Sequence, residues 1–428
     1  FSVTEVPMPA LNTPDVLRLT TRNGLTLTVR HVPRLTRSAA CVRVAVGSHD
    51  VPADWPGLAH FLEHLLFLGT ERFPAAQGLM AYVQQHGGHL NARTSERHTD
   101  FFFELPPEAF AGGLDRLCDM LAHPRLDQDD QRREREVLHA EFIAWAREPS
   151  AQRDLQRLQP LNATHPLRGF HAGNRYSLPV PRAAFQRALT HFHEQFYRTG
   201  HMTLSLVGPQ SQDTLIALAE RYSLELQPGT TATPQPPPPL MSKGSSQYLQ
   251  VEGSHVDLMF TLEQLPTASE EALAFLCHWI NADKPGGLLA HLRQQQLTDS
   301  LRATPVYQFQ DQALLGLTFT GSTDMRAKAQ PIRDSVDDWL CFFSAQQPWT
   351  GLRNEYRRVQ ERQQQVSSAL ELARRDVQHH PTGLSGHGVE ALAVILKHMQ
   401  TEPRPSGQHA WQLPTPNQLK EIVGDKSF

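Results

Sequence analysis

A proline-rich stretch divides this 428-residue chain and limits how it folds. It reads LQPGTTATPQPPPPL over residues 226–240 and holds six prolines among mostly polar residues. Proline lacks a backbone N–H and favours extended, polyproline-like backbone, so such a stretch does not build a packed core. We therefore expect two domains, over residues 1–226 and 241–428, joined by a linker over residues 227–240.

Strand and helix patterns alternate before this linker. Residues 16–32, VLRLTTRNGLTLTVRHV, place two alternating apolar runs around the dipeptide Asn23-Gly24, which is typical of a β-hairpin. Residues 57–69, GLAHFLEHLLFLG, have the length and apolar content of a helix that ends at a glycine. Strands interleaved with helices predict an α+β fold, with a mainly antiparallel sheet packed against helices.

The order partly recurs after the linker. Residues 247–253 and 255–263 predict strands, and residues 270–296 predict a helix pair broken at Pro285-Gly286-Gly287. Residues 352–377, LRNEYRRVQERQQQVSSALELARRDV, predict one long helix. We expect the second domain to resemble the first in architecture.

Composition excludes several classes of protein. The formal net charge of -4 and the absence of dense Lys and Arg runs give no sign of a nucleic-acid partner. No apolar stretch reaches the length of a membrane-spanning helix, so we expect no membrane partner. Four isolated cysteines favour a reducing compartment, the cytoplasm, with the periplasm as the alternative because the chain does not begin with Met.

The five residues HFLEH, 60–64, set three titratable groups into an otherwise apolar helix. His60 and His64 are one helical turn apart, so both imidazoles face the same way, and Glu63 lies on nearly the same face. Neutral imidazole is a good zinc ligand, and a neighbouring carboxylate can take a proton from zinc-bound water. The alternative is two half-buried histidines bonded to backbone, but burying three ionisable groups together is costly without a partner such as a divalent cation.

Two histidines leave a catalytic zinc site incomplete, because such a site usually has three protein ligands. The predicted helix REREVLHAEFIAW, residues 133–145, offers Glu134, Glu136, His139 and Glu141. Glu134 and Glu141 are seven residues apart and share a face, and Glu136 points away from these two. From spacing alone, any of these side chains is a candidate third ligand.

Together these segments resemble the pitrilysin/insulinase family of zinc peptidases, the inverzincins, which carry H-x-x-E-H. GLAHFLEHLLFLGTERFP is similar to the active-site helix of that family, and EREVLHAE to its downstream helix. The resemblance implies one Zn²⁺ bound by His60, His64 and Glu141, with 76 residues between the last two. It also implies Glu63 as the general base and Glu134 as a second carboxylate supporting catalysis.

The segment GGHLNARTSERHTDFFFEL, residues 87–105, is similar to the N-A-x-T strand of the same family. The resemblance implies that Asn91, Ala92 and Thr94 bind the backbone of a peptide substrate. Family enzymes have two homologous halves, and this chain has the length of one. We therefore expect a piece of a longer enzyme, completed by a C-terminal half in the same or a nicked chain, with a homodimer also possible for the family.

The function implied is that of a zinc metalloendopeptidase acting on small peptides. Within the family, the segments most resemble members that trim the precursor peptide of pyrroloquinoline quinone. Two alternatives stay open at this point. One is a general oligopeptidase of the pitrilysin or insulysin type, and the other is a non-catalytic scaffold subunit of the same fold.

Overall fold

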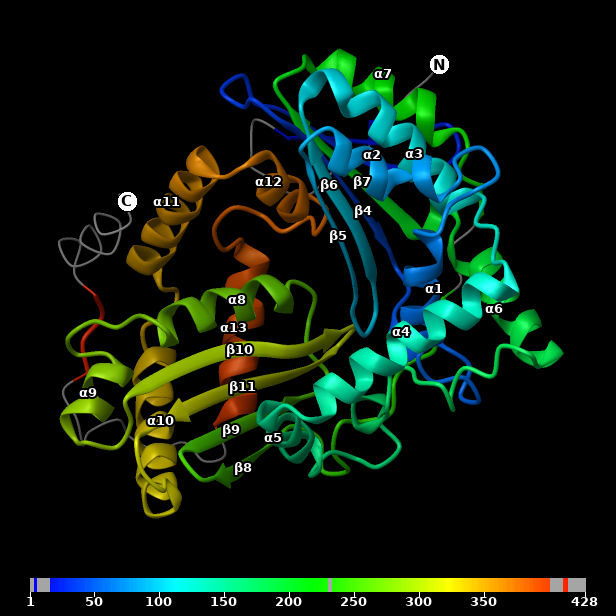
Figure 1. The fold of residues 1–428 in the computed structure, drawn as a ribbon. Helices are drawn as coiled ribbons and strands as arrows, with labels where there is room; N and C mark the ends of the chain where they lie inside the picture. The colour runs from blue at the N-terminus through cyan, green and yellow to red at the C-terminus, as the bar shows by residue number, and fades with distance from the viewer. Residues whose placement is uncertain (1–3, 6–15, 230–232, 401–410, 415–428) are drawn as a thin grey trace. The chain divides into compact units, whose positions relative to one another are not determined.

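The computed structural model describes residues 4–5, 16–229, 233–400 and 411–414 (Figure 1). The chain divides into two units, and each unit is built from three separate stretches of sequence. The first unit takes in the described residues of Phe1–Glu148, Gly169–Gln235 and Val366–His380. The second takes in those of Pro149–Arg168, Pro236–Gln365 and Pro381–Phe428. Residues 230–232 of the proline-rich stretch lie outside the described residues.

A seven-stranded sheet organises the first unit, in the order β1-β2-β3-β7-β4-β6-β5. All neighbours pair antiparallel except β3 and β7, which pair parallel. The predicted hairpin is confirmed, since β2 and β3 pair with Leu19 opposite Leu27. The strands are β1 (Thr4–Glu5), β2 (Val16–Thr20), β3 (Thr26–His31), β4 (Ser38–Val44), β5 (His89–Thr94), β6 (Thr99–Leu105) and β7 (Met202–Gly208).

Both faces of the central strand β4 are buried, which explains why it is mostly apolar without alternation. Two hydrophobic cores flank this sheet, a larger one and a smaller one. Ala40 and Val42 of β4 belong to the larger core, whereas Ala39 and Cys41 belong to the smaller core on the other face, as the two-residue period of a strand requires. The larger core is covered by α1 (Leu58–Leu66), α2 (Leu79–Gln85), α3 (Phe110–Ala122), α4 (Gln128–Ala146), α6 (Ala183–Phe196) and α7 (Gln212–Ser223). The opposite face carries α12 (Ala369–Asp376).

The second unit also packs helices against a sheet, which here has four antiparallel strands in the order β10-β11-β9-β8. Its strands are β8 (Ser246–Glu252), β9 (His255–Leu262), β10 (Ser300–Phe309) and β11 (Gln312–Thr320). Its helices are α5 (Pro149–Leu158), α8 (Ser269–Ile280), α9 (Leu288–Gln294), α10 (Ala329–Ser344), α11 (Thr350–Val366) and α13 (Gly386–Met399). The predicted α+β class, with a largely antiparallel sheet and packed helices in each unit, is confirmed. No described helix has both the length and the apolar composition that crossing a bilayer demands.

The single long helix predicted over residues 352–377 is wrong. The chain leaves α11 at Val366 and starts α12 at Ala369, after an N-cap at Ser368. The Ser368 hydroxyl accepts the backbone N–H of Glu371, and the Glu371 carboxylate accepts the backbone N–H of Ser368. This capping box satisfies N–H groups that a helix start leaves unpaired, so it favours a new helix over continuation of the old one.

A buried ion pair joins α12 to the sheet of the first unit. Arg30 of β3 donates from Nε and Nη2 to the two carboxylate oxygens of Asp376, at 2.8 and 2.7 Å. Both side chains are about 95% buried. In this fork geometry the two charges neutralise each other and share two hydrogen bonds.

We expect Asp376→Ala to lower the free energy of unfolding of the first unit by about 3–5 kcal/mol, because it removes the carboxylate that neutralises the buried Arg30 guanidinium. Urea unfolding, with hydrogen exchange of β3 and β7 to follow the first unit, measures the loss. The half-exposed Arg132, which pairs with Asp129, is the control, and Arg132→Ala should cost much less. Equal losses in the two variants would contradict the assignment.

Candidate metal centre

The H-x-x-E-H segment forms α1, as predicted, and its apolar side chains fix which face turns outward. Phe61, Leu62 and Leu65 are buried in the larger core of the first unit. His60 and His64 lie on the other side of the helix, where both are partly exposed. The amphipathic pattern therefore delivers both imidazoles to one surface.

A close approach of two glycines supports this helix. Gly57, its N-cap, has φ +93°, and a Cβ on it would lie 2.3 Å from the Cα of Gly173. Gly173 has φ +83°, so both positions adopt backbone that side chains disfavour. The contact brings the neighbouring carbonyl of Ala172 within 2.6 Å of His60 Nδ1.

Hydrogen bonds fix the role of Nδ1 in both rings. His60 Nδ1 must donate to Ala172, because a carbonyl only accepts, and His64 Nδ1 donates to the Glu134 carboxylate at 2.7 Å. The two Nε2 atoms are left facing each other, 3.1 Å apart. In their neutral forms both rings would offer an Nε2 lone pair to a metal ion there.

The third predicted ligand comes from α4. Leu138 of α4 is buried in the core, and this anchor turns Glu134 and Glu141 toward α1 because the three positions share a helix face. Glu141 Oε2 lies 3.7 Å from His60 Nε2 and 3.8 Å from His64 Nε2.

These separations suit a metal ion. In a tetrahedral zinc site with bonds of about 2.0–2.1 Å, the ligand atoms are about 3.3 Å apart. One donor atom from each of His60, His64 and Glu141 lies within 4.8 Å of the others. The donor set, two imidazoles and one carboxylate with Nδ1 atoms already bonded, fits zinc, and the assignment of these three as ligands stays a prediction.

Glu136 and His139, the other candidates on α4, face another way. Glu136 binds the Arg175 guanidinium, and His139 Nδ1 accepts the Arg175 backbone N–H. Glu134 instead accepts the hydrogen bond from His64 Nδ1, and this bond orients the imidazole ring. Burial alone would lower the pKa of His64, but the hydrogen bond to Glu134 and the nearby charges of Glu141 and Glu63 raise it above its ordinary value.

Glu63 is buried, and one of its two carboxylate oxygens accepts a hydrogen bond. Its side chain comes from the same helix, and the residue is 8% exposed. The Thr94 hydroxyl donates to Glu63 Oε2 at 2.6 Å. The sequence pattern assigned Thr94 only to substrate binding, and no local signal linked it to Glu63, since 31 residues separate the two.

Strand β5 carries the other two predicted substrate-binding residues at the edge of the sheet. It pairs only with β6 among the described strands. Its residues alternate between exposed and half-buried, with Asn91 exposed and Ala92 half-buried on the core side. The Ala92 N–H donates to the Asn91 side-chain oxygen at 2.9 Å.

Comparison with known proteins identifies the family. The profile described as "Insulinase (Peptidase family M16)" matches residues 27–169, which hold the three candidate ligands, Glu63 and Thr94. A second profile, "Peptidase M16 inactive domain", matches residues 186–348. The chain belongs to peptidase family M16.

Curated M16 relatives cover nearly the whole chain. "Coenzyme PQQ synthesis protein F" of Pseudomonas protegens is 55% identical over 92% of this chain and 47% of its own length. The protein of the same description from Pseudomonas syringae pv. tomato is 48% identical over 98% of this chain and 54% of its own. The chain thus spans about half the length of these relatives.

Solved M16 structures share the fold. The crystal structure of pitrilysin superposes with a TM-score of 0.74 at 21% identity, over 92% of this chain and 43% of pitrilysin. A protease from Helicobacter pylori gives 0.70 at 18% identity, over 90% of this chain and 96% of its own. At these identities the likeness concerns the fold.

We expect Glu134→Gln to weaken zinc binding about 10–100-fold, because the amide is a poorer acceptor for the His64 Nδ1–H that keeps Nε2 available to a metal. Competition against a chromophoric zinc chelator measures the change. Glu136→Gln is the matched control, because Glu136 lies on a different face of the same helix and binds Arg175. Equal zinc affinity in the two variants would remove Glu134 from the site.

Proposed function

We propose that this chain carries the catalytic centre of a zinc metalloendopeptidase that cleaves small peptides. The observation that carries the proposal is the convergence of His60 Nε2, His64 Nε2 and a Glu141 oxygen, with the buried Glu63 carboxylate alongside. Membership of family M16 supports it independently. The proposed substrate is the precursor peptide of pyrroloquinoline quinone, since relatives at 55% and 48% identity are described as coenzyme PQQ synthesis proteins.

In the proposed mechanism, His60, His64 and Glu141 hold zinc, which when bound acidifies a water and polarises the scissile carbonyl. Glu63 takes the proton of the attacking water on its carboxylate and later passes it to the leaving amine. The Thr94 hydroxyl holds Oε2 of Glu63, which leaves Oε1 as the oxygen that exchanges the proton. Thr94 is thus proposed as a positioning residue for the base.

The proposed substrate mode is an extended peptide added to the free edge of β5. Main-chain hydrogen bonds supply most of the affinity in such a complex, and sequence selectivity is correspondingly loose. A substrate carbonyl would compete with the Asn91 side-chain oxygen for the Ala92 N–H. Asn91 therefore keeps this donor bonded until a peptide arrives.

Activity is proposed for the full-length protein, because the chain spans about half of its curated relatives. The remainder, in the same or a nicked chain, is the proposed partner that completes the enzyme. A non-catalytic scaffold of the same fold is a weaker alternative, because each ligand position and the base position hold the residue that the chemistry needs.

The decisive test is Glu63→Gln in the full-length protein, assayed by mass spectrometry on the quinone precursor peptide and on an unrelated peptide of equal length. We expect zinc content to stay unchanged and turnover to fall about 10²–10⁴-fold, because the amide cannot accept the proton. Exposed Glu108→Gln should match the wild type.

Chelator should abolish cleavage by the wild type, and zinc should restore it. Full turnover by Glu63→Gln would refute the base assignment, and no cleavage by the zinc-loaded wild type would favour the scaffold. Equal cleavage of both peptides would favour a general oligopeptidase over a pathway enzyme.

Thr94→Val removes the hydroxyl at nearly constant volume, whereas Thr94→Ser keeps it. We expect Thr94→Val to lower kcat about 10–100-fold with KM and zinc content unchanged, because a hydrogen bond to a charged group contributes about 1.5–3 kcal/mol. Thr94→Ser should keep most of the activity. A raised KM with unchanged kcat would show instead that Thr94 acts on the substrate.

A further inference from the structure

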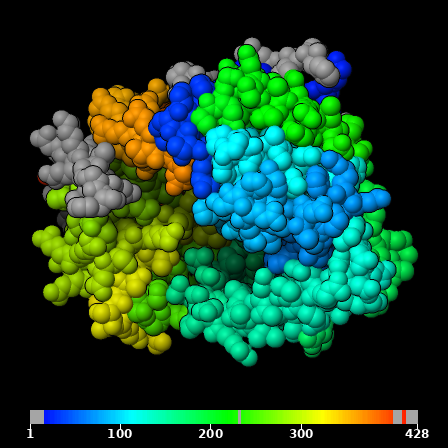
Figure 2. All heavy atoms as spheres, turned by 45° about the horizontal axis from the view of Figure 1, so that its top comes forward, coloured from blue at the N-terminus to red at the C-terminus, as the bar shows by residue number. Residues whose placement is uncertain are grey.

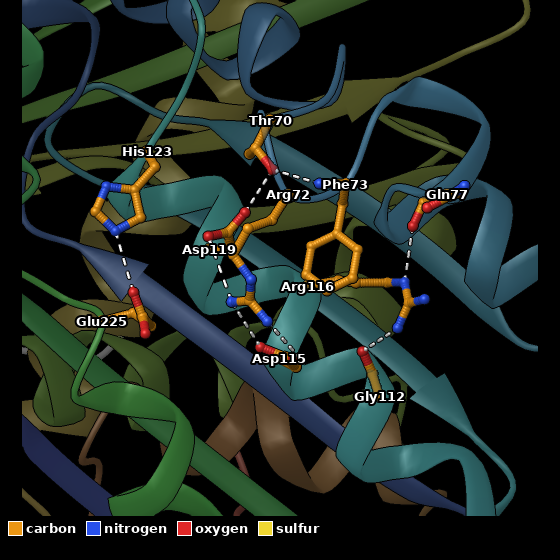
Figure 3. A network of polar contacts seen from close by, with 10 residues as sticks. All are labelled: Thr70, Arg72, Phe73, Gln77, Gly112, Asp115, Arg116, Asp119, His123 and Glu225. Carbon is orange, nitrogen blue, oxygen red and sulfur yellow. Dashed lines mark hydrogen bonds and ion pairs between the residues drawn. The ribbon is translucent and has the colours of Figure 1, made fainter.

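A second group of metal-ligating side chains lies at one end of α3 in the first unit. Asp119, His123 and Glu225 each offer one ligand atom within 4.8 Å of the others. Figure 3 shows the three side chains together, with Arg72 beside Asp119. None of them belongs to the HFLEH helix or to α4, and the proposed peptidase mechanism does not use them.

Helix geometry brings Asp119 and His123 together. They are four residues apart, so they share one face of the last turn of α3, and the His123 N–H closes that turn on the Asp119 carbonyl at 2.8 Å. Glu225 follows the end of α7 and places Oε2 3.1 Å from His123 Nε2. The C-terminal end of a helix carries partial negative charge, which favours a cation.

Asp119 is the unusual member, because its residue is only 1% exposed. The Thr70 hydroxyl donates to Oδ2. Its other oxygen, Oδ1, pairs with Arg72 Nη1 at 3.6 Å, which is longer than a hydrogen bond. A buried carboxylate is stabilised by a cation, and a metal ion can take this role. The Thr70 bond resembles the support that ligating carboxylates receive in metal sites.

Arg72 is the competing cation. Its guanidinium is bonded to both oxygens of Asp115 at 3.2 Å and is half exposed, so it can stay with Asp115 when another cation binds Asp119. Figure 3 shows the Arg72 guanidinium paired with Asp115 and Asp119, and Glu225 paired with His123. The three carboxylates outnumber this one guanidinium, which favours binding of a divalent ion.

Solvent reaches the group. A cavity of about 560 Å³ within the first unit is lined by His123, Arg125 and Glu71 among others. The side chains of His123 and Glu225 are 46% and 44% exposed. The neighbouring helices α2 and α3, light blue and cyan, lie at the surface in Figure 2. An ion can therefore enter and keep water on its open coordination positions.

We propose that Asp119, His123 and Glu225 form a second site for a divalent transition-metal ion such as zinc. One imidazole and two carboxylates suit zinc better than calcium, which takes oxygen ligands only. The 3.1 Å between His123 Nε2 and Glu225 Oε2 is close to the roughly 3.3 Å that separates ligands of a tetrahedral ion. The ion replaces the proton of that hydrogen bond and links the end of α3 to the end of α7.

The test is a zinc titration of the metal-stripped, full-length protein, followed by isothermal calorimetry at neutral pH. The wild type should bind two ions in separate steps. His123→Gln and Glu225→Gln should each weaken one step at least about 10-fold and spare the other. His191→Gln, an exposed histidine on α6, is the matched control and should keep both steps.

His64→Ala provides the reciprocal variant, since it should remove the other step and spare the one that depends on His123. The two sites are therefore distinguishable, and the second does not depend on the peptidase proposal. Circular dichroism checks that each variant is folded. Saturation of the wild type at one ion, or an unchanged titration in both His123→Gln and Glu225→Gln, would overturn the second site and leave the Arg72 ion-pair network as the role of these residues.

Discussion

Two imidazole Nε2 atoms that face each other at 3.1 Å are the constraint on which the site depends. They face each other because each Nδ1–H is committed elsewhere, that of His60 to the Ala172 carbonyl and that of His64 to Glu134. This arrangement leaves both Nε2 atoms directed at one point where a metal ion could bind. The close approach of Gly57 to Gly173 and the anchoring of α4 through Leu138 both serve this geometry.

Much of this site was predictable from local spacing. H-x-x-E-H on an amphipathic helix places His60 and His64 on one face, and the seven-residue interval brings Glu134 and Glu141 to one face of α4. The contact of Glu141 with α1 was not predictable from spacing, which left Glu134, Glu136 and His139 open, and came only from family resemblance. The bonds of the Ala172 carbonyl to His60 and of the Thr94 hydroxyl to Glu63 could not be predicted, because each depends on tertiary packing of segments far apart in sequence.

The fold, like the site, was predictable where its signal is local in the sequence and not where it depends on tertiary contacts. Alternating apolar runs identified the β2–β3 hairpin, because a strand period of two is a local property. The break between α11 and α12 was missed although its signal, Ser368 followed by Glu371, is a capping box. That α12 belongs to the first unit, after more than a hundred residues of the second, is a tertiary fact that periodicity does not encode.

The two candidate metal sites differ in how fully hydrogen bonds orient their side chains. At the first, both histidines have partners on the nitrogen that does not face the centre. At the second, His123 and Glu225 are half exposed, and Arg72 competes for Asp119. We therefore expect the first group to bind zinc more tightly than the second.

The most direct measurement is a crystal structure of the protein loaded with one equivalent of zinc, with diffraction recorded on both sides of the zinc absorption edge. The account predicts a single strong anomalous peak about 2.0–2.1 Å from His60 Nε2, His64 Nε2 and a Glu141 oxygen, with Glu63 beside it but unbound. A peak elsewhere, or a Glu141 carboxylate turned away from the two imidazoles, would contradict it.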